Sequence, residues 1–259
     1  MRRAFFLVLV FLTACGRSEP VRTDVNASQT RPPQFSDADP VEFGSQSPRN
    51  FRVHGVDLSK YQATIDWNAA KRAGVNFAWI KATEGGDLLD VAFAANHDNA
   101  ARAGVAVGAY HFFYWCRPAA EQARWFIRNV PKRAGDLPPV LDLEWTPFSP
   151  TCTRRPPQGE VIREAQIFLD ILERHYGQRP LVYATKEIWD DRDLRPLRAE
   201  FWLRSTAKPV REVYDRTPWR IWQYSATGRV PGIAGDVDLN AFNGSPADWQ
   251  SWYGRRAIR

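Results

Sequence analysis

The chain of 259 residues is 44% hydrophobic and 25% charged, a globular balance that excludes a wholly disordered or collagen-like protein. Lysine and arginine outnumber aspartate and glutamate by 35 to 29, which gives a formal charge of +6 and suits either an anionic partner or a solubilising surface. The sequence has no long Lys/Arg block and no zinc-finger spacing, so we expect no nucleic acid as a partner.

The first fifteen residues resemble an export signal. Arg2 and Arg3 precede an apolar run over residues 4–12, which is shorter than the roughly 20 residues that span a bilayer. The sequence Leu-Thr-Ala-Cys at 12–15 resembles a bacterial lipobox, which implies removal of residues 1–14 and a lipid on Cys15. An ordinary signal peptide with a chance cysteine is the alternative. We expect an exported protein that is lipid-anchored in the bacterial cell envelope, facing the periplasm from the outer membrane.

Residues 15–50 are predicted to form a disordered tether between the lipid and the folded part of the chain. Residues 16–50 contain five prolines and no Leu, Ile, Met or Trp. Such a composition cannot supply a hydrophobic core. The remaining residues, 51–259, are predicted to form one domain, and we expect that domain to act as a monomer.

Strands and helices alternate along this domain. The predicted strands are 53–59, 77–83, 105–113, 139–145 and 181–185, and the predicted helices that follow them are 65–73, 91–103, 118–129, 159–176 and 186–193. Three further strands, 201–205, 220–225 and 236–242, are joined mostly by loops and precede a helix at 246–253.

This alternation predicts an α/β fold with a parallel sheet. Eight strands can close a TIM-like barrel, here a modified one in which five β/α units are followed by three strands without full helices. An open doubly wound sheet is the competing topology. The absence of a Gly-rich nucleotide loop after any strand counts against it.

Carboxylates lie near the ends of several predicted strands. Asp57 ends the first, Asp142 and Glu144 end the fourth, and Asp236 and Asp238 lie in the eighth. Active groups of a parallel barrel collect at the C-terminal ends of its strands, so these acids are the candidate catalytic residues.

Asp142 and Glu144 are the most informative pair. Residues two apart in a strand share a face, and two steps of about 3.3 Å separate their Cα atoms by about 6.6 Å. Hydrolysis of a sugar bond needs two such groups, one protonated to serve the leaving oxygen and one ionised near the anomeric carbon. Two carboxylates in salt bridges with Arg or Lys are the alternative.

Cys116 and Cys152 each follow a predicted strand at the same end of the fold. An exported protein can pair such cysteines, so we predict a disulfide, with two unpaired thiols as the alternative. Two cysteines without a nearby histidine pair lack the ligands of a metal site, and we expect neither a metal nor a cofactor.

Six segments occur in one order that is similar to a known family. They are GVDLSKYQ at 55–62, FAWIKATEG at 77–85, GAYHF at 108–112, PVLDLE at 139–144, WQY at 222–224 and VDLNAF at 237–242. Each is weak alone, but together they resemble the glycoside hydrolase family 25 lysozymes, the Chalaropsis-type muramidases. The resemblance covers residues 51–245 and implies a barrel of five β/α units and three further strands.

The resemblance also implies an activity: cleavage of the β-1,4 bond between N-acetylmuramic acid and N-acetylglucosamine in peptidoglycan. Glu144 would be the general acid, and Asp142 would orient the substrate's acetamido group or stabilise the oxocarbenium charge. Asp57 and Asp238 would line the same cleft, since Asp238 rather than Asp236 matches the motif. Retaining and inverting stereochemistry both stay open, with participation of the substrate acetamide preferred.

Exposed aromatic side chains are expected to stack on the sugars, with core packing as the alternative for each. The candidates are Tyr61, Tyr110, Trp145, Trp222 and Tyr224. Two other functions stay open: a peptidoglycan-binding lipoprotein without activity, and a glycosidase that acts on another N-acetylated glycan such as chitin.

Overall fold

The computed structural model describes residues 30, 32–62, 64–215 and 217–259. The predicted signal at 1–14, the lipidation site Cys15 and the first part of the predicted tether therefore lie outside the described residues. Within the described part of the chain, no helix is both long and apolar enough to cross a membrane.

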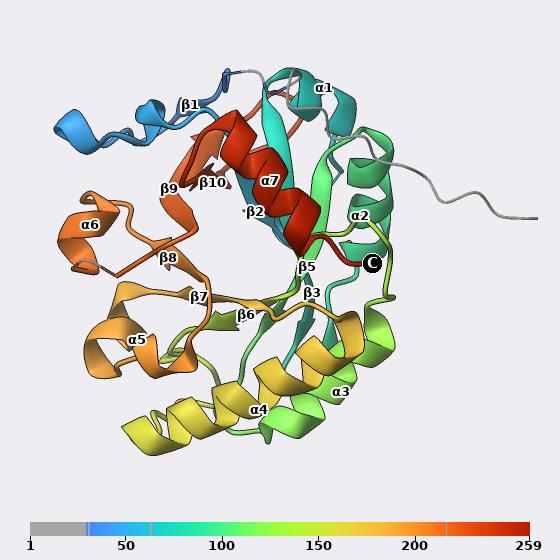
Figure 1. Ribbon diagram of the computed structural model, residues 1–259, viewed down its shortest axis with the longest axis vertical. Coiled ribbons are helices and arrows are strands. Elements are labelled where there is room, and N and C mark those ends of the chain that lie inside the picture. Colours follow the sequence, from blue (N-terminus) through green and yellow to red (C-terminus); the bar gives the residue numbers. More distant parts are fainter. Residues whose placement is uncertain (1–29, 31, 63, 216) are drawn as a thin grey trace, which may run out of the picture.

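Eight strands of the described chain close into a barrel (Figure 1). Around the ring they are β2 (His54–Leu58), β3 (Val75–Glu84), β5 (Ala106–Phe112), β6 (Val140–Leu143), β7 (Leu181–Ala184), β8 (Phe201–Arg204), β9 (Ile221–Arg229) and β10 (Val237–Phe242). Neighbours from β2 to β9 are parallel, whereas β10 pairs antiparallel with both β9 and β2. The predicted barrel is confirmed, and an open sheet is excluded because the ring closes.

A helix follows each of the first five barrel strands. These helices are α1 (Trp67–Arg72), α2 (Phe93–Arg102), α3 (Ala119–Asn129), α4 (Gln158–Tyr176) and α5 (Lys186–Asp191). The longest, α4, buries Val161, Ala165, Phe168 and Leu172 at spacings of three or four residues, so one face packs on the barrel and on α3 beside it (Figure 1). Of the last three strands, β8 is followed by the short helix α6 (Val210–Val213), β9 leads to β10 without a helix, and β10 precedes the C-terminal helix α7 (Pro246–Arg256). The two-residue strand β4 (Leu88–Leu89) pairs antiparallel with the end of β3.

Strand residues alternate between the barrel interior and the helix-covered face. In β3, Phe77 and Trp79 belong to the interior cluster, whereas Ala78 and Ile80 belong to the cluster beneath the helices. Gly108 of β5 makes room for the Trp79 indole, because a Cβ there would lie 2.6 Å from the indole nitrogen. The interior is therefore packed solid along its lower part.

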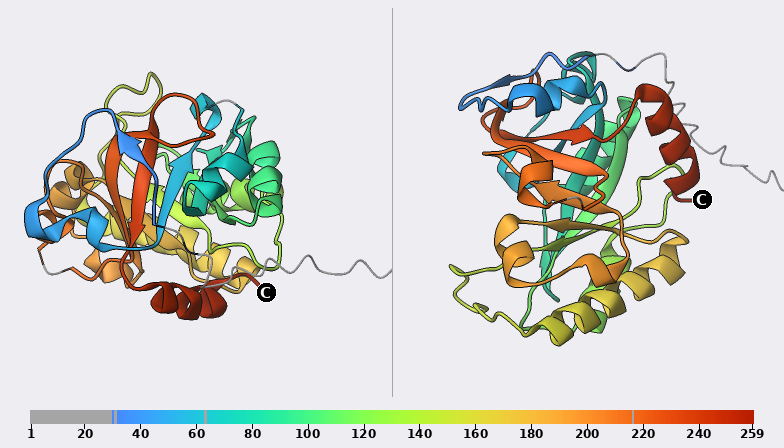
Figure 2. Two further views of the ribbon diagram at one scale, coloured as in Figure 1. Left: turned by 90° about the horizontal axis from the view of Figure 1, so that it is seen from above. Right: turned by 60° about the vertical axis from the view of Figure 1, so that its left-hand side comes forward.

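The C-terminal helix α7 (Pro246–Arg256) closes one end of the barrel. It begins with a capping box in which the Ser245 side chain accepts from the backbone of Asp248 and the Asp248 side chain accepts in return. Its Trp249 and Trp252 join the interior cluster, with the Trp249 ring stacked 5.1 Å from Phe77. Figure 2 shows the helix lying across one end of the strands, which leaves the opposite end for a site.

The segment before the barrel differs from the expected disordered tether. Strand β1 (Ser36–Asp37) lies beside β9 (Figure 1) and pairs antiparallel with it. The buried ring of Phe43 lies edge-on to Trp222 at 5.0 Å. The described residues from 32 to 50 are thus part of the folded body, which corrects the predicted boundary at residue 50. The absence of Leu, Ile, Met and Trp indicated that this segment could not pack against a core. Phe43 nevertheless supplies such an apolar contact.

The predicted disulfide is confirmed. Cys116 lies in the loop after β5, Cys152 lies in the loop after β6, and their Cα atoms are 5.7 Å apart. The bond joins two loops at the carboxyl ends of adjacent strands.

Candidate active site

The end of the barrel opposite α7 holds a cavity of about 320 Å³. It is lined by Asp57, Ser59, Tyr61, Lys81, Tyr110, Phe112, Asp142, Glu144, Tyr183, Trp202, Arg204, Gln223 and Asp238. Most of these residues come from inward-facing strand positions, so the alternation that packs the lower barrel also delivers polar groups to its open end.

The structure brings together the four carboxylates that the sequence singled out. Asp57 and Asp238 are direct partners across the antiparallel β2–β10 pair. Asp142 and Glu144, two residues apart at the end of β6, both line the cavity. Asp236 does not: it is exposed, lies before the first residue of β10, and pairs with Arg229 outside the cavity.

Asp57 is held as a hydrogen-bond acceptor. Its Oδ2 accepts from the side-chain amides of Gln223 at 3.0 Å and Asn240 at 2.7 Å. Each amide is oriented in turn, because the Tyr183 hydroxyl donates to Gln223 Oε1 and the Trp202 indole donates to Asn240 Oδ1, both at 2.8 Å. Burial raises the pKa of Asp57 to about 6, and these amide donors oppose the rise.

Asp142 is buried with one oxygen unsatisfied. Among the described residues, its Oδ1 has no hydrogen-bond partner. Burial raises the pKa of Asp142 well above its usual range, and the negative charge of Glu144 raises it further. An unpaired buried oxygen is expensive, which favours a ligand group as its partner.

Glu144 and Asp238 are also shifted toward the protonated form. Burial raises the pKa of Glu144 to about 7 and that of Asp238 to about 8. The charge of Arg204 opposes both shifts, and Asp57 adds to both. Four carboxyl groups in one cavity cannot all ionise, so near neutral pH the site offers a proton donor beside ionised oxygens.

Two cations balance this cluster, and the sequence analysis did not single them out. Lys81 bonds to Glu84 Oε2 at 2.5 Å, while Arg204 lines the cavity at the end of β8. Strand alternation was the available signal, because Arg204 follows the inward-facing Trp202 by two residues. Gln223 likewise follows the interior Ile221 by two residues, but only the structure shows which face of β9 points inward.

The five predicted aromatic residues divide into two groups. Tyr61, 81% exposed, and Tyr110 line the cavity. Trp222 and Tyr224 do not, because they flank Gln223 on β9 and so face the opposite side of the strand. Trp222 is buried in the core outside the barrel, and the Tyr224 hydroxyl lies 3.0 Å from a ring nitrogen of His54. These two assignments are therefore corrected to packing.

Trp145 is corrected in the same way. It follows Glu144 and so turns away from the cavity, and only 6% of it is exposed. Its indole nitrogen donates to Asp191 Oδ2 at 2.9 Å, and its ring lies 5.6 Å from that of Trp115.

In the described part of the chain, no group of three or more His, Cys, Asp or Glu side chains is arranged to hold a metal ion.

Comparisons with known proteins agree with this arrangement. The family model described as glycosyl hydrolases family 25 matches residues 56–233. Lysozyme M1 of Streptomyces globisporus is 37% identical over 211 residues, which cover 75% of this chain and 69% of that protein. An N,O-diacetylmuramidase of Chalaropsis sp is 31% identical over 144 residues, covering 53% and 68% respectively.

Solved structures show the same fold. A family 25 glycosyl hydrolase from Bacillus anthracis has a TM-score of 0.71 and 34% identity, covering 83% of this chain and 98% of that one. The bacterial lysozyme from Streptomyces coelicolor has a TM-score of 0.68 and 33% identity, covering 79% and 98%.

Because the pKa of Asp238 is raised, we expect that removing its carboxyl group increases the Tm of the protein at alkaline pH but not at acidic pH. A folded-state pKa of about 8, against an ordinary 3.8, means that the neutral carboxyl stabilises the fold at acidic pH and that this contribution is lost as pH rises through about 8. Asp238→Asn should therefore match the native protein in Tm at pH 4 and exceed it at pH 9, by at least about 2–4 °C for each kcal/mol gained. Thermal melts at both pH values measure this.

Asp236→Asn is the matched control, because Asp236 lies outside the cavity and is exposed. It should show no gain at pH 9. An equal Tm difference for Asp238→Asn at both pH values would contradict the burial of an ionisable group there.

Proposed function

The chain belongs to glycosyl hydrolases family 25, and from that membership we propose that it cleaves the β-1,4 bond between N-acetylmuramic acid and N-acetylglucosamine in peptidoglycan, with Glu144 as general acid. The family supports a lysozyme-type glycoside hydrolase acting on peptidoglycan. The observation that carries the assignment of Glu144 is its place in the cavity beside Asp142, with a pKa raised by burial to about 7.

In the proposed reaction, protonated Glu144 donates its proton to the glycosidic oxygen as the bond from that oxygen to the anomeric carbon breaks. The electron pair of the bond leaves with the N-acetylglucosamine oxygen, and positive charge develops on the muramic acid ring. Water then supplies a hydroxyl to the anomeric carbon and returns a proton to Glu144. The products are a reducing N-acetylmuramic acid end and a free N-acetylglucosamine hydroxyl.

The other cavity residues have supporting roles in this proposal. Asp142, with its unpaired Oδ1, would accept from the N–H of the substrate's acetamido group and orient it. Asp57, fixed by two amides, would stay the more ionised group and stabilise the ring charge, while Asp238 lines the same cleft. Tyr61 and Tyr110 offer ring faces to the sugars.

Glu144→Gln should reduce turnover on purified peptidoglycan by roughly 10²–10⁴-fold, because the amide cannot donate the required proton. The assay is mass spectrometry of fragments released by residues 32–259, and fragments of the native sequence should end in reducing N-acetylmuramic acid. The matched control is Glu212→Gln on α6, an exposed carboxyl that lies outside the cavity and does not act on the Glu144 pKa, and it should leave turnover unchanged.

Two results would contradict the proposal. Full activity of Glu144→Gln would remove its assigned role. Absence of fragments from several peptidoglycan types, with a folded native protein, would favour a binding lipoprotein, and activity on chitin oligosaccharides alone would favour a different N-acetylated substrate.

We further propose that the protein is exported and held in the cell envelope by a lipid on Cys15. The support is the basic and apolar segment at 2–12 followed by Leu-Thr-Ala-Cys. Expression in a bacterial host with radiolabelled palmitate should label the native protein and not Cys15→Ser. Equal labelling of both, or of neither, would contradict the anchor.

A further inference from the structure

The carboxyl group of Glu144 is placed by its backbone alone. Among the residues that the structure describes, it has no hydrogen bond and no ion pair, in contrast to Asp57 with its two amide donors. Glu144 is also the first residue after β6, at the start of the long loop to α4. Whatever fixes this loop beginning therefore fixes the position of the proposed acid.

A neighbouring loop holds the Glu144 backbone directly. The indole N–H of Trp115, in the loop after β5, donates to the Glu144 carbonyl oxygen at 2.9 Å. Trp115 is itself buried, and its own carbonyl accepts from Arg154 at 3.3 Å. The Arg154 guanidinium is anchored by Glu160 of α4, at 2.7 Å to one oxygen. Burial of its ring and the bond from Arg154 to its carbonyl therefore both hold Trp115, the donor to Glu144, in place.

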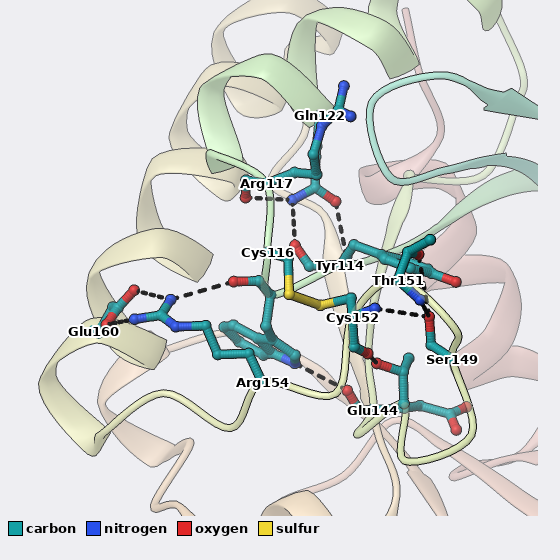
Figure 3. The surroundings of a disulfide bond; sticks show 12 residues. Tyr114, Cys116, Arg117, Gln122, Glu144, Ser149, Thr151, Cys152, Arg154 and Glu160 are labelled. Atoms are coloured by element: carbon teal, nitrogen blue, oxygen red, sulfur yellow. Dashed lines mark hydrogen bonds and ion pairs between the residues drawn. A yellow bond between two sulfur atoms is a disulfide. The ribbon is translucent and has the colours of Figure 1, made fainter.

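The disulfide joins the same two loops one residue further on. Cys116 follows Trp115 directly and is bonded to Cys152 in the loop that Glu144 begins (Figure 3). That loop closes back on itself, because the Thr146 hydroxyl donates to the Cys152 carbonyl at 2.5 Å. The Cys152 backbone N–H donates to Ser149 Oγ at 3.1 Å. Figure 3 shows Glu144 and Ser149 near the Cys116–Cys152 disulfide.

We propose that Trp115 and the Cys116–Cys152 disulfide are positioning residues that hold Glu144 in its proton-donating place. This inference rests on the proposed function, since it assigns Trp115 and the disulfide a part in the same reaction. Without the indole donor and the loop tether, only the strand end would fix the Glu144 backbone. A carboxyl group with no side-chain partner would then spread over several positions in the cavity.

The charged groups that face Glu144 come from six elements, and none of them belongs to the loops that carry Trp115 and the disulfide. They are Asp57, Lys81, Asp142, Glu187, Arg204 and Asp238. Burial is the largest cause of the raised Glu144 pKa, so a looser loop that admits water should lower that pKa toward its ordinary value.

Trp115→Phe is the most selective test, because it removes the indole N–H and keeps an aromatic ring in the core. We expect kcat on peptidoglycan to fall by about 10-fold, as for a modest misplacement of a catalytic group, with KM within about 2-fold. The alkaline limb of the kcat/KM profile should move to lower pH. The Cys116→Ala/Cys152→Ala double variant, assayed well below its own Tm, should change both quantities in the same direction.

Trp125→Phe is the matched control. The Trp125 indole also donates to a backbone carbonyl, but to that of Leu88 in β4, at 3.0 Å, rather than to the loop that begins at Glu144. Its kcat and pH profile should equal those of the native protein. If Trp115→Phe does not fold by circular dichroism, Thr146→Val takes its place, because it removes the bond to Cys152 with little change of volume.

Unchanged kcat and an unchanged alkaline limb in folded Trp115→Phe, or in Thr146→Val in its place, would overturn the inference. An equal loss of kcat in Trp125→Phe would also overturn it. A loss confined to Tm would also overturn it, since a merely structural role predicts that result. These outcomes differ from failure of the proposed function, in which the native protein itself releases no fragments.

Discussion

The closed barrel gathers four carboxyl groups at one end, where Asp57 and Asp142 are buried and Glu144 and Asp238 are half-buried. Desolvation raises the pKa of Asp57, Asp142, Glu144 and Asp238 alike, so ionising all of them together is unfavourable. The fold can hold such a cluster because the space beneath it is filled by large side chains and sealed by α7. The packed end of the barrel, next to α7, stabilises the fold, and the open end of the same strands holds the candidate catalytic groups.

The four acids differ in how firmly they are held, and this difference agrees with the roles proposed for them. Asp57 is fixed through a chain of donors from β7, β8, β9 and β10, which suits a charge that stays in place during the reaction. Glu144 has no side-chain partner among the described residues, which suits a group that gives up and regains a proton. Its backbone carbonyl is instead bonded by the Trp115 indole, next to the disulfide that joins the two loops.

Much of this could be predicted from sequence, because strand alternation is a local property. The β/α order predicted the barrel, and the DLE spacing placed Asp142 and Glu144 on one face. The face of β9 could not be predicted in this way, since its inward residue depends on register with β8 and β10, and the β9–β10 pairing is irregular. Trp222 and Tyr224 were therefore assigned to the cleft, while Gln223 between them was missed. The order of residues 32–50 depends on contacts with β9 that no local pattern reveals.

The proposal that protonated Glu144 is the acid can be tested by the pH dependence of kcat/KM for the native protein on peptidoglycan. A pKa of about 7, raised by burial, means that the proton is present below neutral pH and lost above it. Activity should decline as pH rises through about 7, and the decline should follow the Glu144 titration observed by NMR. Activity that stays constant or rises between pH 6 and pH 9 would contradict it.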